Sequence, residues 1–185
     1  MTIEELRKSF WNDAAKNGLI LGLTLTAISA LAVVCRFDID RPYLGSALQY
    51  GAMICMLGMF CKQRGIKHDP NGFNYRQNMG YIFAIMLFTG IIAGVSIYIL
   101  QQFVFPDTYK QIIDLAIERV KEDGVEIDQA VVNQTMAMVK NPFIMVFSSI
   151  ISMIINGAFI GIFTSIFTRR MPQPTQEQDN TQASI

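Results

Sequence analysis

Charged residues are scarce in this sequence. Only 16% of the 185 residues are charged, whereas a soluble domain carries about 25%. Fifteen basic and fifteen acidic residues leave no net charge, which argues against nucleic acid as a partner. Hydrophobic residues make up 51% of the chain. The composition therefore predicts a protein whose main partner is the lipid bilayer.

Residues that commonly carry chemistry are also few. The only histidine is His68, and Cys35, Cys55 and Cys61 show none of the spacings typical of a zinc site or a redox pair. The sequence contains no G-x-S-x-G nucleophile motif and no glycine-rich phosphate-binding loop. We therefore expect no catalytic residue, no metal site and no cofactor, and we predict that the protein is not an enzyme.

Long uncharged runs are the main feature that is present. They occupy residues 17–35, 42–61, 77–105 and 141–168. Each is close to or above the roughly 20 apolar residues that a helix needs to cross a bilayer, and a spanning segment of this kind must be helical to satisfy its own backbone. The sequence thus predicts an all-α integral membrane four-helix bundle with spans at about 17–36, 42–61, 77–105 and 141–168. Ala30-Leu31-Ala32 resembles a signal-cleavage site, but the preceding segment lacks net positive charge, so we expect the first run to be retained.

The segments around the spans predict three further parts. Residues 1–16 place Ile3, Leu6 and Phe10 on one helical face, which predicts an amphipathic helix at the membrane surface. Residues 107–140 hold seven acidic and four basic residues between apolar positions at helical spacing, which predicts an extramembrane helical hairpin between the third and fourth spans. Residues 171–185 contain two Pro and four Gln and are expected to be a disordered tail after a membrane domain covering 17–170.

The distribution of Lys and Arg predicts the orientation. Nine lie in the N-terminal segment, the loop containing His68 and the C-terminal tail, against six in the other two loops. Because cytoplasmic loops carry the excess of basic residues, we expect both termini in the cytoplasm.

Small residues recur at a spacing of four in three of the runs. The pairs are Gly18/Gly22, Gly90/Gly94 and Gly157/Gly161. Such G-x-x-x-G pairs let two helix backbones approach closely in a membrane. We expect them to pack helices within one chain, and the alternative is packing between two copies.

Polar residues inside the runs form a second pattern. Gln49 lies near the middle of the second run, and Ser148, Ser152 and Asn156 follow one another at a spacing of four in the last. A buried amide in a membrane needs a hydrogen-bonding partner on another helix. These residues are interpreted as contacts that hold helices together, and the alternative is the lining of a small polar pocket. No charged residue interrupts the runs, which argues against proton relays and ion-coupled transport.

Three carboxylates lie on one ridge of the predicted hairpin. Asp114, Glu118 and Glu122 are four residues apart, so their like charges oppose the helix that carries them. The ridge is interpreted as a solvated face. The alternatives are a docking site for a basic partner and a weak divalent-cation site.

The order of these parts resembles a known family. Phe10-Trp11 precedes the first glycine pair, Phe73-Asn74-Tyr75-Arg76-Gln77 precedes the third run, Pro106-Asp107 opens an acidic helical insert, and the last glycine helix ends in Arg169-Arg170. This layout is similar to the bacterial four-helix membrane proteins catalogued as domain of unknown function 4199. The resemblance covers residues 8–170 and implies a small multi-pass protein of the bacterial inner membrane, without an activity, a cofactor or a site.

Two functions fit these observations. The first is a non-catalytic accessory or scaffold subunit that meets another membrane protein or a second copy of itself. The second is a small transporter or lipid-handling protein that uses Gln49 and Asn156. A transporter needs a water-accessible cavity at mid-depth, whereas a scaffold is packed shut there, and we expect the packed arrangement.

Overall fold

The computed structural model describes residues 3–35, 42–67, 74–122 and 129–168. Described residues form α1 (Ile3–Val34), α3 (Pro42–Lys67), α4 (Tyr75–Ile99), a π-helical turn η1 (Leu100–Val104), α5 (Pro106–Glu122), α6 (Gln129–Lys140) and α7 (Pro142–Thr168). The predicted tail and His68 lie outside the described residues. The fold is all-α over the part of the chain that is described, as predicted.

Four helices are long and apolar enough to cross a membrane. These candidate spans are Lys8–Val34, Tyr43–Ile66, Tyr75–Val104 and Pro142–Thr168. Their positions agree with the four uncharged runs, but the first begins well before residue 17 and the second continues past residue 61. The chain is therefore a multi-pass membrane protein with four candidate spans.

Helix ends follow the local sequence. Pro42, Pro106 and Pro142 each begin a helix, where the missing N–H of proline removes no intrahelical bond. The N–H of Phe143 donates to Oδ1 of Asn141 at 3.0 Å, so this asparagine caps α7. The N–H of Asn74 donates to Oε1 of Gln77 at 3.0 Å as part of a capping box at the start of α4.

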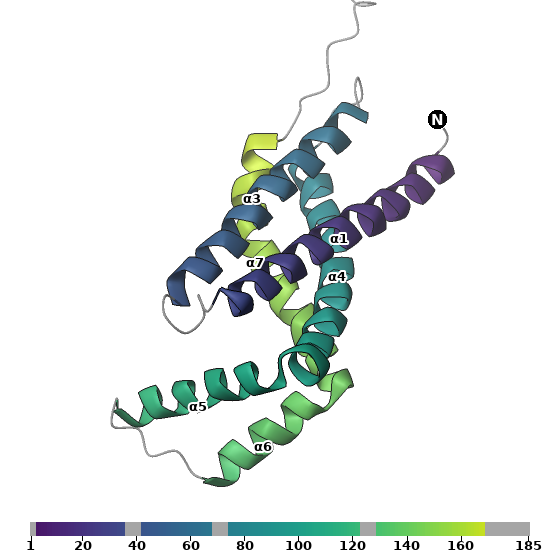
Figure 1. The fold of residues 1–185 in the computed structure, drawn as a ribbon. Coiled ribbons are helices and arrows are strands. Elements are labelled where there is room, and N and C mark those ends of the chain that lie inside the picture. The colour runs from purple at the N-terminus through teal and green to yellow at the C-terminus, as the bar shows by residue number, and fades with distance from the viewer. Residues whose placement is uncertain (1–2, 36–41, 68–73, 123–128, 169–185) are drawn as a thin grey trace, which may run out of the picture.

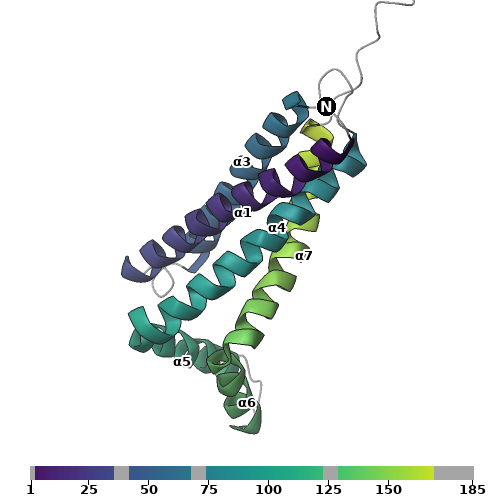
Figure 2. The same cartoon turned by 90° about the vertical axis from the view of Figure 1, so that its right-hand side faces the viewer.

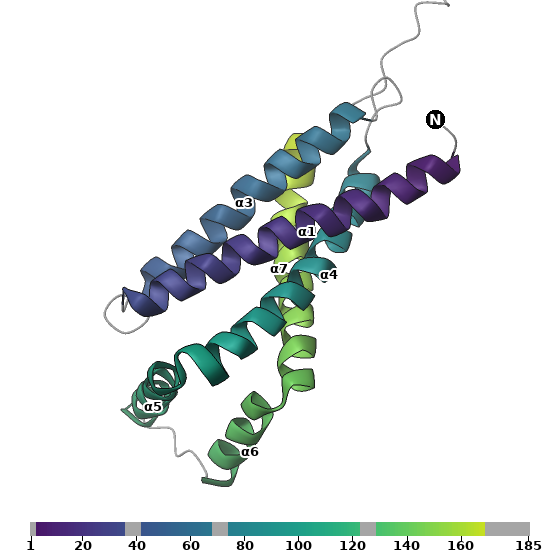
Figure 3. The ribbon, with the colours of Figure 1, turned by 45° about the vertical axis from the view of Figure 1, so that its right-hand side comes forward.

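The helix α4 is the centre of the bundle. It packs most extensively against α7 and next against α1. The helix α3 packs mainly against α1 and α7 and contacts α4 only slightly. Figures 1 and 3 show α1 and α3 side by side, with α4 and α7 crossing behind them. The core between α1, α3 and α4 is filled by fully buried apolar side chains, among them Leu21, Leu57, Ile82 and Ile85.

The two helices α5 and α6 lie at one end of the bundle, away from the start of α1 and the end of α7 (Figure 2). The helix α5 contacts η1, and α6 contacts α7. Within the predicted segment, the described residues form the two helices α5 and α6, which diverge from this junction (Figure 1). Their arrangement as an extramembrane hairpin stays a prediction.

The N-terminal segment is not a separate element. The helix α1 continues without a break from Ile3 to Val34. The ring of Phe10 lies 5.6 Å from that of Tyr81 on α4, measured between ring centroids. Phe10 therefore packs against the bundle.

Candidate functional site

The pair Gly90 and Gly94 brings α4 against the backbone of α7. A Cβ atom added at Gly90 would lie 2.6 Å from Cα of Ile150, and one at Gly94 would lie 2.8 Å from Cα of Val146. Real Cβ atoms do not approach other heavy atoms this closely. Any larger residue at these two positions must therefore push the helices apart.

The glycines of α7 receive side chains from α4 in return. A Cβ at Gly157 would lie 2.5 Å from Cγ of Met86, and one at Gly161 would lie 2.9 Å from Sδ of Met79. The two helices run in opposite directions, and the glycines of α7 lie opposite methionine side chains of α4. The obstacle here is a flexible side chain rather than a backbone, so a substitution in α7 can be relieved more easily than one in α4.

The third pair packs α1 onto the other face of α4. A Cβ at Gly18 would lie 2.6 Å from Cβ of Phe88, and one at Gly22 would lie 2.9 Å from Cβ of Ile92. The hydroxyl of Thr89 also donates to the carbonyl of Gly18 at 3.2 Å. All six glycines thus lie at contacts within one chain. By contrast, an added Cβ would meet nothing within 4 Å at three other glycines: Gly51, Gly58 and Gly80.

The amides of Gln49 and Asn156 do not meet one another. Nε2 of Gln49 donates to Oγ of Ser29 at 3.0 Å and links α3 to α1. The hydroxyl of Tyr50 donates to Oδ1 of Asn156 at 3.3 Å and links α3 to α7. Each amide therefore bridges a different pair of helices.

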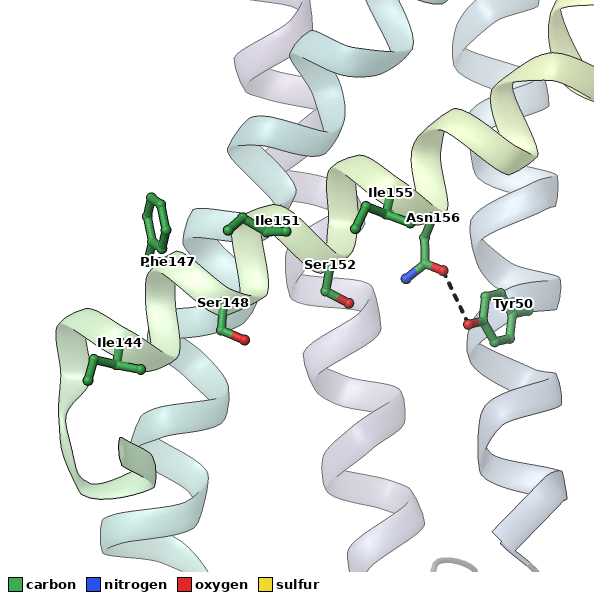
Figure 4. A pocket seen from close by; sticks show the side chains of 8 residues that line it. All are labelled: Tyr50, Ile144, Phe147, Ser148, Ile151, Ser152, Ile155 and Asn156. Carbon is green, nitrogen blue, oxygen red and sulfur yellow. Dashed lines mark hydrogen bonds between the residues drawn. The ribbon is translucent and has the colours of Figure 1, made fainter. Parts of the chain in front are cut away.

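Three polar residues of α7 line an open groove. Ser148, Ser152 and Asn156 point to the same side of the helix, and Tyr50 closes one end (Figure 4). The groove has a volume of about 510 Å³ and also exposes Ile151. It opens outward from the bundle, because Ser148 and Ser152 are exposed. Gln49 is not part of it.

A charged pair is buried between α1 and α3, and the uncharged runs did not reveal it. The guanidinium of Arg64 pairs with the carboxylate of Asp13, and Nη1 of Arg64 also donates to Oγ of Ser9 at 3.0 Å. The side chain of Arg64 is 3% exposed and that of Asp13 is 18% exposed. The sequence analysis placed both outside the spans. This is a correction, because candidate spans reach from Lys8 and to Ile66.

Aromatic side chains surround the pair. Cζ of Arg64 lies 5.8 Å from the ring centroid of Phe10 and 5.6 Å from that of Tyr81. Nδ2 of Asn17 donates to the hydroxyl of Tyr81 at 2.8 Å. A guanidinium over two ring faces is favoured by about 0.5–2 kcal/mol per contact. These neighbours compensate for the loss of water around the arginine.

The spacing of the buried residues along α3 is a sequence signal that indicates this cluster. Leu57, Phe60, Cys61 and Arg64 are all buried, and their spacing of three, one and three residues defines one helix face. The apolar face therefore continues one turn beyond the last uncharged residue. Counting charges alone ended the span too early.

The carboxylates of the acidic ridge lie on α5. Asp114 and Glu118 are both exposed. Glu122 is the last residue of α5, and its side chain lies outside the description. Among the described residues, no group of three metal-binding side chains comes together.

The arrangement defines a class of protein: a multi-pass membrane protein of four candidate spans, organised around one glycine-packed central helix. A family model described as "Protein of unknown function (DUF4199)" matches residues 16–170. The chain belongs to this DUF4199 family, as its layout suggested. A search of curated proteins and a search of solved structures found no match.

Proposed function

We propose that this chain is a non-catalytic scaffold or accessory subunit of the membrane, and that it associates with a second copy of itself through the groove on α7. The helix pairs around α4 pack through glycine contacts, and the core of the bundle is filled by apolar side chains. That packing supports a structural role. The groove supplies a face for assembly.

The observation that carries the proposal is the amide of Asn156. Its Oδ1 accepts from Tyr50, while its Nδ2 has no partner among the described residues. Asn156 lies near the middle of the candidate span Pro142–Thr168. An unsatisfied N–H at that depth is costly because lipid chains cannot accept a hydrogen bond. A partner that accepts this bond would be held in the groove.

A second copy fits the groove for a geometric reason. Two copies inserted in the same direction are related by a two-fold axis along the membrane normal, which brings equal residues to equal depth. The carboxamide of Asn156 carries both donors and an acceptor, and the hydroxyls of Ser148 and Ser152 can do either. The polar stripe is therefore complementary to itself.

We further propose the orientation that the basic residues indicate. Both termini then lie in the cytoplasm of a bacterial cell, and α5 and α6 lie on the opposite side of the inner membrane. The start of α1 and the end of α7 lie at one end of the bundle and α5 and α6 at the other (Figure 2), which supports placing the two groups on opposite sides of the membrane. The acidic ridge of α5 would remain available to a further partner.

The test is disulfide crosslinking in native membranes. Ser152→Cys is introduced into a chain in which Cys35, Cys55 and Cys61 are replaced by alanine, and a mild oxidant is added. We expect a disulfide-linked dimer. Leu23→Cys, on the exposed face of α1, is the control and should remain monomeric. Equal dimer yields from both positions would contradict a specific α7 interface.

Two substitutions separate the groove from the bundle. Asn156→Leu removes the amide that would cross the interface, and we expect it to abolish the crosslink at position 152. Tyr50→Phe removes only the intramolecular bond and should leave the crosslink in place. If Tyr50→Phe abolished the crosslink and Asn156→Leu did not, the groove would serve the folding of one chain rather than assembly.

The alternative is a small transporter or lipid-handling protein, which is favoured by the same polar groove at mid-depth. Leu57→Cys tests it, because Leu57 is completely buried in the core. A scaffold predicts no reaction of this thiol with a water-soluble reagent in folded protein. Rapid labelling would indicate a water-filled path and would favour transport.

A further inference from the structure

A second pocket lies where the chain leaves the third span. It has a volume of about 370 Å³ and lies between the π-helical turn η1, the start of α5 and the end of α6. Its polar lining comes from Gln101, Gln102, Tyr109, Lys110 and Lys140. The two lysines belong to different helices, and only the fold brings them to one cavity.

The pocket lies at the edge of the membrane. The third candidate span ends at Val104, and the fourth begins at Pro142, directly after Lys140 and Asn141. Residues at such boundaries lie at the depth of the lipid headgroups. Lys110 and Lys140 are both exposed, so they can reach a ligand that approaches from the bilayer.

The charge of the pocket is of one sign. No carboxylate lines it. Asp107 and Asp114, the acidic residues that flank Lys110 in the sequence, are exposed and outside the lining. Neither Lys110 nor Lys140 pairs with a carboxylate of the described residues. Two ammonium groups at one cavity repel each other, and an anion between them would relieve the repulsion.

Gln101 supplies a second feature. Its Oε1 is buried and has no hydrogen-bond partner among the described residues. Gln101 lies in the π-helical turn Leu100–Val104, and such turns occur frequently at functional sites because they displace side chains from the regular helix. A buried acceptor of this kind requires an N–H or O–H donor. A bound ligand can provide it.

We propose that this pocket binds the headgroup of a phospholipid. The phosphate lies between Lys110 and Lys140, and an N–H or O–H of the headgroup donates to Oε1 of Gln101. Pro106 and Ile113 provide an apolar wall, against which the glycerol backbone packs. Phosphatidylglycerol and phosphatidylethanolamine carry the required donor, whereas phosphatidylcholine carries none.

Binding of short-chain phosphatidylglycerol to the purified full chain in a non-ionic detergent tests the proposal. We expect Lys110→Gln with Lys140→Gln to weaken binding about tenfold or more, because hydrogen bonds to charged groups are removed. Lys62→Gln, an exposed lysine of α3, is the matched control and should bind like the native protein. Both lysines of the pocket are exposed, so the unfolding midpoint of the double variant should be unchanged.

Three further measurements bear on the ligand. Phosphatidylcholine should bind more weakly than phosphatidylethanolamine, which has the same net charge but carries N–H donors, and Gln101→Leu should remove this difference. Inorganic phosphate should not displace phosphatidylglycerol at equal concentration. If it does, the site binds free phosphate and the lipid assignment is wrong. Equal weakening by Lys62→Gln, or equal affinity for the two lipids in the native protein, would also overturn the proposal.

Discussion

At the scale of single residues, the pair of Arg64 and Asp13 makes the sharpest prediction. Arg64→Gln leaves the carboxylate of Asp13 without its guanidinium partner inside the bundle. Removing one member of a buried pair costs about 3–5 kcal/mol, and we expect the lower end because Asp13 is partly exposed. Thermal unfolding in detergent measures the loss.

The matched control for this change is Lys62→Gln, two residues away on the exposed side of α3. It should leave the unfolding midpoint unchanged, since exposed charges contribute little. A double variant, Arg64→Met with Asp13→Leu, should recover part of the stability, because it leaves no unpaired charge behind. If Arg64→Gln unfolds at the same temperature as Lys62→Gln, the pair does not stabilise the bundle.

At the scale of elements, the glycine contacts of α4 predict that replacing glycine by alanine changes stability differently at Gly90 and at Gly80. Gly90→Ala places a methyl group against the backbone of Ile150 and should cost about 1–3 kcal/mol, the usual effect of overpacking. Gly80→Ala enters open space on the same helix and should be neutral or slightly stabilising, because alanine favours helix. Unfolding midpoints compare them, and equal midpoints would show that close packing at Gly90 is incidental.

The acidic ridge of α5 is also a property of one element. Replacing Asp114, Glu118 and Glu122 by their amides removes like charges four residues apart, each pair of which opposes the helix by a few tenths of a kcal/mol, roughly 0.2–0.5. We expect a small rise in helix stability and no other change if the ridge is a solvated face. A binding partner that is lost in the triple variant, and from native protein at high salt, would instead identify a docking site.

At the scale of the whole molecule, the two ends of the bundle should face different compartments. In a chain lacking Cys35, Cys55 and Cys61, we expect Asp114→Cys on α5 to react with an impermeant thiol reagent added to the periplasmic side of intact cells. Lys62→Cys near the end of α3 should react only after the inner membrane is opened. Labelling of both from the periplasmic side would contradict the proposed orientation.

The number, type and approximate position of the elements could be predicted from the sequence alone. The four uncharged runs predict the spans because placing a charge in lipid is costly. This cost depends on each residue by itself, so it can be read from the sequence. The prolines at residues 42, 106 and 142 and the cap at Asn141 act within one helical turn, so helix starts were also predictable. The family model that matches residues 16–170 agrees with this layout.

Only the tertiary structure decided which residues meet. The sequence could not pair Arg64 with Asp13, 51 positions apart, because each looks like an ordinary basic or acidic residue beside a span. It could not show that Gln49 and Asn156 bridge different helices, or that α1 continues through residue 16 into the bundle. Lys110 and Lys140 likewise share a pocket only because α5 and α6 begin and end at one junction. Partition into lipid is a sum over single residues, whereas contacts depend on how helices cross.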